Sequence, residues 1–186
     1  GRAAYIISAI VNFHNGPTGM VYNPGTALGS AWKNNFFLVE FVGNPSRSHI
    51  WAFTLKPKGA SFELAQDKDV VSGILPTGIK FGPDGALYVA DWINGWGTKN
   101  YGRVWKLDVT DDKNDLKAER TETKRLMQLD YTSQGDSDLN KLLFYSDMRI
   151  RQKAQFELVS RGQKGRDEFK KALDQRENQL ARVHAI

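Results

Sequence analysis

An internal repeat constrains the fold of this chain more than any other feature. The segments PTGMVYNPGTAL (17–28) and PTGIKFGPDGAL (76–87) align without a gap and begin 59 residues apart. Each copy continues with an apolar run, a polar loop and a second apolar run that contains a tryptophan, Trp51 in the first copy and Trp105 in the second. Similarity at a fixed period indicates one structural unit that is built twice and stacked.

The apolar runs of the repeat are short and typical of β-strands. The first copy contains FFLVEF at 36–41, the second contains LYVADW at 87–92, and ASFELA at 60–65 adds an outer strand to the first copy. Groups of four short strands with turn signals between them are the sequence pattern of β-propeller blades. We therefore predict an all-β fragment of a β-propeller, about two blades, over residues 1–110, with the two sheets packed face to face.

The part of the chain that follows has a helical composition. Only three of the 17 glycines lie there, and no proline or tryptophan does. Within 139–162 the apolar side chains recur at steps of three and four, which predicts two helices broken at 145–147. A third helix is expected from about Asp167 to the last residue. Its apolar side consists of Phe169, Leu173, Leu180 and Val183. The predicted boundaries are a linker at 111–124 and a helical segment at 125–186.

Composition and charge exclude several functional classes. The formal net charge is +5, from 26 Lys and Arg against 21 Asp and Glu, and both signs are interspersed, which argues against a nucleic-acid partner. The absence of cysteine excludes disulfides and thiolate metal sites. No apolar run reaches the ~18 residues of a membrane span. His14 and His49 stand outside any metal-ligand spacing, so no metal site is predicted.

The ordered series of motifs resembles a known family. PTGM, YNPGTAL, FFLVEF, IWAF, LKPKGASFEL, PTGIKFGPDGALYVADWINGWG and GRVWKLD are similar, in this order, to the end of the propeller in glucose/sorbosone dehydrogenase-like proteins. The match is to the large bacterial "membrane-bound dehydrogenase" type, in which DMRIRQKAQFELVSRG resembles the first HEAT-like repeat after the propeller. The resemblance implies a β-propeller fragment followed by an α-helical HEAT-like solenoid segment, and it covers nearly the whole chain.

The family resemblance also implies an activity. It implies oxidation of a sugar or alcohol with pyrroloquinoline quinone and Ca²⁺, electron transfer to a downstream cytochrome c domain, and a periplasmic or secreted location. In such enzymes a lysine and paired arginines from late blades hold the quinone. The matched positions here are Leu75, Thr77 and Val42–Gly43, which carry no charge, whereas Arg47 and Lys99 lie in nearby loops and are candidates to substitute for the missing groups. We therefore expect this segment alone to bind no quinone, and we expect the family's catalytic histidine to lie in earlier blades.

The same reasoning predicts a fragment of a larger protein. Two blades leave open sheet edges, and the helical pattern reaches the last residue without a capping signal. We expect the missing partner to be the rest of the chain's own propeller.

Candidate substrate-binding residues lie in loops and strand ends at one end of the predicted sheets. A sugar stacks on aromatic rings and bonds to polar groups beside them. The predicted set is Thr18, Arg47, His49, Thr77, Asp91, Trp92, Asn94 and Trp96. An alternative interpretation is structural: Trp92 and Trp96 pack between the sheets, and Asp91 holds its own loop.

Two functions are compatible with these residues. The first is a fragment of a quinoprotein-like sugar or alcohol dehydrogenase, with its catalytic residues elsewhere. The second is a non-catalytic propeller that binds a carbohydrate or a protein, with the helices as a scaffold. Fold does not decide between them, because function depends on the site.

Overall fold

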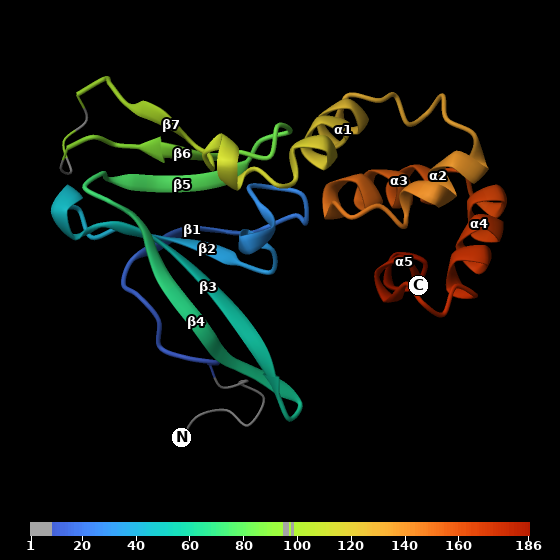
Figure 1. Ribbon diagram of the computed structural model, residues 1–186, viewed down its shortest axis with the longest axis horizontal. Helices are drawn as coiled ribbons and strands as arrows, with labels where there is room; N and C mark the ends of the chain where they lie inside the picture. Colours follow the sequence, from blue (N-terminus) through green and yellow to red (C-terminus); the bar gives the residue numbers. More distant parts are fainter. Residues whose placement is uncertain (1–8, 95–96, 98) are drawn as a thin grey trace. The chain divides into compact units, whose positions relative to one another are not determined.

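The computed structural model describes residues 9–94, 97 and 99–186 and shows two antiparallel sheets followed by α-helices (Figure 1). The chain divides into two compact units. The first unit contains the sheets, with residues up to 23, 34–82 and 87–108. The second contains the helices together with two hairpin turns, 24–33 and 83–86.

The first sheet has four strands in chain order. They are β1 (Pro17–Tyr22), β2 (Phe36–Glu40), β3 (His49–Lys58) and β4 (Ser61–Ser72). Two 3-10 turns, η1 (Ser30–Trp32) and η2 (Pro45–Arg47), lie in the loops on either side of β2. The outer strand β4 is twice as long as the predicted 60–65, because the charged stretch after it continues to pair with β3. An edge strand accepts such charges without loss of pairing.

The second sheet has three strands, β5 (Pro76–Phe81), β6 (Leu87–Asp91) and β7 (Arg103–Leu107). Its register repeats that of the first sheet, since Pro17 lies opposite Glu40 and Pro76 lies opposite Asp91. Both first strands carry a register shift at the residue after the proline. The prediction of two antiparallel sheets is therefore confirmed, and the described residues of the second copy form three strands.

The two sheets pack through apolar side chains. Val39, Phe41 and Leu75 form a buried cluster against which Ile79 and Trp92 pack. The rings of Phe37 and Phe81 meet edge to face at 5.5 Å between centroids. Two stacked sheets do not close a ring, so the described residues show a pair of sheets and not a complete propeller.

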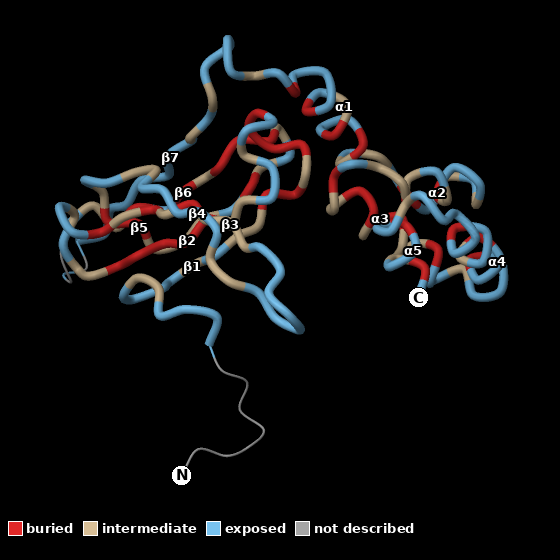
Figure 2. The backbone as a smooth tube through the Cα atoms, turned by 60° about the horizontal axis from the view of Figure 1, so that its bottom comes forward, coloured by how far each residue is buried: buried red, intermediate tan, exposed pale blue. Residues whose placement is uncertain are grey.

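The helices of the second unit surround a core of their own. A 3-10 turn, η3 (Asp111–Lys113), precedes them, and they are α1 (Lys117–Met127), α2 (Asp136–Leu142), α3 (Met148–Ser160), α4 (Gln163–Leu173) and α5 (Gln179–His184). Helix α3 contacts the other four. Leu139, Leu143 and Leu158 are fully buried in this core, and Figure 2 shows buried backbone in red along β2 and α3. Among the described residues, no helix is long and apolar enough to cross a membrane.

The helical part differs from the prediction in two places. Helix α1 begins at Lys117, inside the segment 111–124 that was predicted to be a linker. The prediction of a single third helix was wrong, because two helices, α4 and α5, occupy that part of the chain. Asn178 accepts a hydrogen bond from the amide of Ala181 and begins the second of them. Its predicted apolar side was also wrong in part, since Leu173, Leu180 and Val183 are exposed while alanines fill the core. A solenoid needs stacked repeats, and the described helices form one core, so the HEAT-like arrangement stays a prediction.

Candidate ligand site at the loop end of the second sheet

Each sheet ends its second strand with a carboxylate that bonds to a tryptophan of the third strand. Trp51 Nε1 donates to Glu40 Oε2 at 2.8 Å, and Trp105 Nε1 donates to Asp91 Oδ2 at 2.9 Å. The second oxygen of each carboxylate accepts from the backbone that leads into the first strand, at Asn15 N or Leu75 N. We call this repeated arrangement the carboxylate–tryptophan clasp. It ties three strands of each sheet together at one end.

The Asp91 carboxylate is completely engaged in this clasp. Its side chain is fully buried, it accepts from the amides of Leu75 and Ile93, and Arg103 Nη2 lies 3.3 Å from Oδ2. Burial alone would raise the pKa of Asp91, but the bonds from Trp105, Ile93 and Leu75 and the Arg103 charge outweigh it and lower that pKa. The carboxylate thus holds its own loop, as the structural interpretation predicted, and offers no free oxygen to a ligand.

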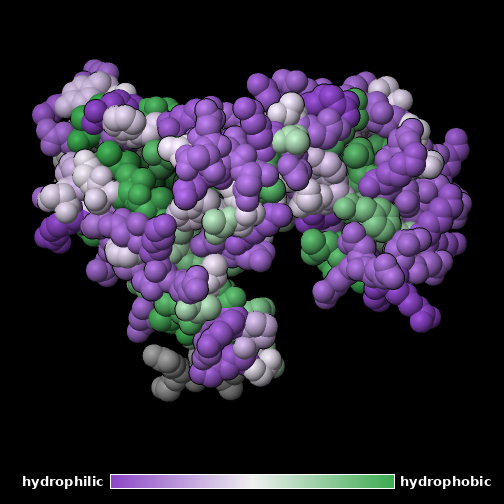
Figure 3. Space-filling model, in the orientation of Figure 1, coloured by the Kyte–Doolittle hydropathy of each residue, from purple (hydrophilic) through white to green (hydrophobic). Residues whose placement is uncertain are grey.

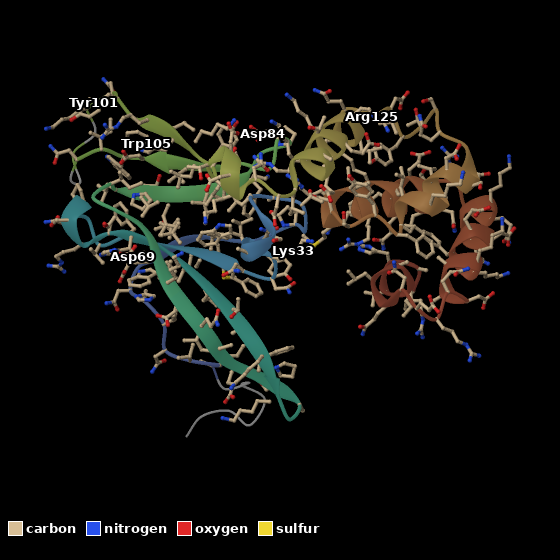
Figure 4. All side chains as sticks on the ribbon, viewed as in Figure 1. Lys33, Asp69, Asp84, Tyr101, Trp105 and Arg125 are labelled. Atoms are coloured by element: carbon tan, nitrogen blue, oxygen red, sulfur yellow. The ribbon has the colours of Figure 1, made fainter. Side chains whose placement is uncertain are left out.

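A cavity of about 480 Å³ opens beside this clasp. It is lined by Thr77, Ala90, Asp91, Trp92, Lys99, Asn100, Tyr101, Gly102, Arg103 and Val104. Tyr101 is half exposed, and the Arg103 guanidinium lies 5.0 Å from the centre of the Trp105 ring. Figure 4 shows Tyr101 and Trp105 at the same end of the second sheet. The cavity therefore combines aromatic rings with two cationic side chains.

The structure brings together three of the eight predicted substrate-binding residues. Thr77, Asp91 and Trp92 line the cavity, and Thr77 Oγ1 donates to the carbonyl of Ala90 at 3.4 Å. Trp92 also packs on the core between the sheets, with its ring centroid 6.3 Å from that of Phe41, and its Nε1 donates to Gly97 O. Trp92 consequently serves the packing that the structural interpretation assigned to it and exposes only part of its ring.

Four other predicted residues, which the structure describes, do not line this cavity. Thr18 is exposed at the register shift of β1, Arg47 is exposed in η2, and Asn94 is exposed in the loop after β6. His49 Nδ1 lies 2.9 Å from Asp69 Oδ2 on the neighbouring strand, where Figure 4 labels Asp69. Trp96 lies outside the described residues.

Sequence reasoning missed Tyr101, Arg103 and Glu40. The sequence contained a signal for Glu40, because the alignment of FFLVEF with LYVADW matches Glu40 with Asp91. Tyr101, Arg103 and Trp105 follow one another at steps of two residues around the start of the third strand. In a strand, this spacing places side chains on the same side. Lys99 was named only as a substitute for a missing quinone ligand.

The residues present do not fit pyrroloquinoline quinone and Ca²⁺. The matched position Leu75 is fully buried, Thr77 bonds to backbone, and the Arg103 charge is neutralised by Asp91. Lys99 is then the remaining cation among the described lining residues, against the three carboxylates of the quinone. No group of three or more His, Asp or Glu side chains in the described part of the chain could hold a metal ion.

These features define a class: a repeat-built β-sheet protein with an attached helical unit and a small mixed aromatic and cationic cavity. No protein-family model matches the chain, and no curated protein matches it. A glucose dehydrogenase structure is similar with 18% identity and a TM-score of 0.39, over 51% of this chain and 26% of that chain. A second glucose dehydrogenase crystal structure is similar with 17% identity and a TM-score of 0.44, over 59% and 28%. The chain spans about a quarter of their length. Both similarities are weak.

Proposed function

We propose that this chain is the ligand-binding section of a glucose dehydrogenase-like β-propeller protein, and that its cavity binds a sugar without oxidising it. The observation that carries the proposal is the lining of the cavity beside the Asp91 clasp. Tyr101 and the exposed part of Trp92 offer ring faces for a pyranose, and Thr77 and Asn100 offer polar groups for its hydroxyls. Asp91 holds these residues in place and contributes no contact to the sugar.

The charge of Lys99 favours a sugar that carries a carboxylate. Lys99 and Arg103 both line the cavity, and Arg103 is already paired with Asp91, so Lys99 supplies the additional positive charge. Arginine and lysine side chains bind carboxylates through charge-assisted hydrogen bonds. A hexuronate is therefore expected to bind more tightly than the neutral hexose.

Titration with glucuronate and glucose, followed by tryptophan fluorescence and by amide chemical shifts, tests this proposal. We expect glucuronate to bind with a Kd of about 1 mM and glucose at least roughly threefold more weakly. Lys99→Gln should remove the preference, and Tyr101→Ala should weaken both sugars. Phe156→Ala, on an exposed position of α3, is the matched control. Equal shifts in Tyr101→Ala and the unsubstituted chain would place the sugar elsewhere.

The second candidate function is a part in quinone-dependent oxidation, and the resemblance to sugar dehydrogenases favours it. Titration of the chain with pyrroloquinoline quinone and Ca²⁺, monitored by the quinone absorbance, separates the two. We expect no saturable change, because burying unpaired carboxylates is costly and the cavity offers too few cations. A saturable change that is lost in Lys99→Gln would favour the oxidoreductase and overturn the purely binding role.

A further inference from the structure

The second sheet differs from the first in the charge of one row of side chains. In the first sheet this row crosses β1, β2 and β3 and is apolar, with Val21, Phe37 and Ala52 opposite one another. In the second sheet the equivalent row crosses β5, β6 and β7 and consists of Lys80, Tyr88 and Lys106. Two apolar positions of the first copy are therefore lysines in the second.

The apolar row of the first sheet is covered inside the molecule. Phe37 and Ala52 are at most 1% exposed, and the ring of Phe37 meets that of Phe81 on β5 edge to face. Because successive side chains of a strand point to opposite sides, Lys80, which precedes Phe81, points away from the first sheet. We call this side the outer face of the second sheet. Its strand positions are Gly78, Lys80, Tyr88, Ala90, Val104 and Lys106.

The outer face is exposed and carries positive charge. Lys80 and Lys106 are exposed, and Tyr88 is half-buried between them. The outer positions of the described strands β5, β6 and β7 include no acidic residue. Hydrophobic surface lies instead beside β3 and β4, where the lower part of Figure 3 shows it in green. Covering the outer face with an apolar sheet would bury ammonium groups at a high cost, so this face suits an anionic ligand better.

The outer face continues directly from the cavity beside the Asp91 clasp. Ala90 and Val104 lie opposite each other on this face, and both line the cavity. Tyr88 and Lys106 follow two positions along the same strands, about 7 Å further. The Val104 side chain is 72% exposed, so a ligand held in the cavity can extend over it onto the outer face.

The spacing of the charged row suits a chain of sugars. Neighbouring strands lie about 5 Å apart, so the backbones of Lys80 and Lys106 are separated by about 10 Å, with Tyr88 between them. An aromatic ring can stack on a pyranose, and lysine side chains form charge-assisted hydrogen bonds with carboxylates. A polymer of uronate residues carries one carboxylate on each sugar and therefore matches a ring that is flanked by two cations.

We propose, on the basis of the sugar cavity proposed above, that the ligand is an acidic polysaccharide, a chain of uronate residues that continues from the cavity over the outer face. One uronate occupies the cavity, with its carboxylate at Lys99. The residues that follow pass over Val104, stack on Tyr88 and place their carboxylates at Lys80 and Lys106. A single hexuronate contacts the cavity alone, whereas the polysaccharide uses both surfaces.

The test compares one uronate with a short chain of the same sugar on the full 186-residue protein. Titration calorimetry with galacturonate and tetragalacturonate at low salt measures both dissociation constants. We expect tetragalacturonate to bind at least roughly fivefold more tightly. In the double variant Lys80→Gln, Lys106→Gln its Kd should come within about twofold of that of galacturonate, which itself should not change. Lys164→Gln, the same loss of charge at an exposed position of α4, is the matched control.

A second measurement needs no substitution. Tetragalacturonate should shift the amide resonances of Lys80 and Lys106, and galacturonate should leave them in place. Equal affinity of the two ligands, or an unchanged affinity of the double variant for tetragalacturonate, overturns the proposal. Self-association that the double variant abolishes, with no effect on tetragalacturonate, also overturns it and identifies a protein surface as the occupant.

The monomer reports on the cavity alone, so the two proposals can be told apart. If galacturonate binds and the chain of four gains nothing, the extension over the outer face is wrong and the sugar cavity stands. If neither sugar binds, the sugar cavity is wrong, and the extension is wrong with it.

Discussion

Glu40 and Asp91 show how a single carboxylate can hold a blade-like sheet together. Each sits at the last position of the second strand and receives one indole N–H from the third strand and one amide from the lead into the first. A hydrogen bond to a charged group contributes more than one between neutral groups. Because both copies of the repeat use the same arrangement, the clasp is part of how the repeat folds.

The first prediction concerns substitutions that remove the indole N–H donor and keep an aromatic ring. Trp105→Phe should lower the free energy of unfolding by about 1–3 kcal/mol, because the buried Asp91 oxygen loses a charge-assisted bond. Trp51→Phe should act in the same direction, through Glu40. Urea denaturation measures both. Phe156→Leu, at an exposed site, should change the free energy of unfolding by less than about 0.5 kcal/mol. Trp variants that match this control would show that the clasp contributes no stability.

The second prediction concerns acid. The pKa of Asp91 is lowered in the folded protein from its ordinary value of 3.8, so the ionised carboxylate stabilises the fold above that value. This contribution is lost as the pH falls through the folded pKa, because the unfolded chain binds the proton more readily. Asp91→Asn should therefore be less stable at neutral pH and should lose stability less steeply below 3.8. Thermal unfolding across the acid range measures this, and parallel curves for the two proteins would contradict it.

At the scale of elements, helix α4 approaches helix α3 at a glycine. A Cβ on Gly165 would lie 1.8 Å from the carbonyl oxygen of Leu158, so no side chain fits there. Gly165 is buried, and Ala172 of the same helix enters the shared core. Such a contact depends on the absence of a side chain and not on conformational freedom.

The third prediction follows from this contact. Gly165→Ala should destabilise the helical unit by about 1–3 kcal/mol, although alanine has the higher helix propensity by about 1 kcal/mol. Circular dichroism during thermal unfolding measures the change. Lys164→Ala, one position earlier and exposed, should be neutral or slightly stabilising. A Gly165→Ala protein that gains stability as Lys164→Ala does would show that the helices separate without cost.

The sequence predicted strands and helices best where the two copies of the repeat align. It predicted them least well where the length of a strand depends on hydrogen bonds to the neighbouring strand. Alignment of the two copies predicts both sheets because hydrophobic spacing and turn residues recur. The full length of β4 could not be predicted from the sequence, because the charged stretch 67–69 shows no apolar alternation although it pairs with β3. The end of α4 escaped detection because Leu173 and Leu180 continue a helical spacing although neither is buried.

The candidate site was predicted only in part for a similar reason. Asp91 and Trp92 were predicted from their residue types. Residue type does not reveal that both carboxylate oxygens of Asp91 are hydrogen-bonded within its own sheet. That distinction depends on the strand register that brings the Trp105 indole, fourteen positions away in the sequence, to the Asp91 carboxylate.

At the scale of the whole molecule, the two compact units do not coincide with the two compositional halves. The hairpin turns 24–33 and 83–86 belong to the helical unit. Within that unit, Thr26 Oγ1 lies 2.6 Å from Asp147 Oδ2 and 3.0 Å from Thr123 Oγ1, and all three residues are buried. The amide of Met148 donates to Pro24 O at 2.7 Å. The chain therefore passes repeatedly between the units, and each hairpin turn is stabilised by helices distant in sequence.

The last prediction is that these turns open with the helices and not with their own strands. Thr26→Val keeps the shape of the side chain but leaves Asp147 without the hydroxyl bond, which should cost about 1–3 kcal/mol. Amide hydrogen exchange should then accelerate at least roughly tenfold at Leu28 and Met148, whose amides bond within the helical unit. Exchange at Phe37 in β2 should change much less. Thr26→Ser keeps the hydroxyl and is the matched control. Val89→Ala, in the core of the second sheet, should produce the opposite pattern, because it destabilises strands through a cavity. If Val89→Ala instead accelerates exchange at Leu28 and Met148 as strongly as Thr26→Val does, the turns open with the sheets.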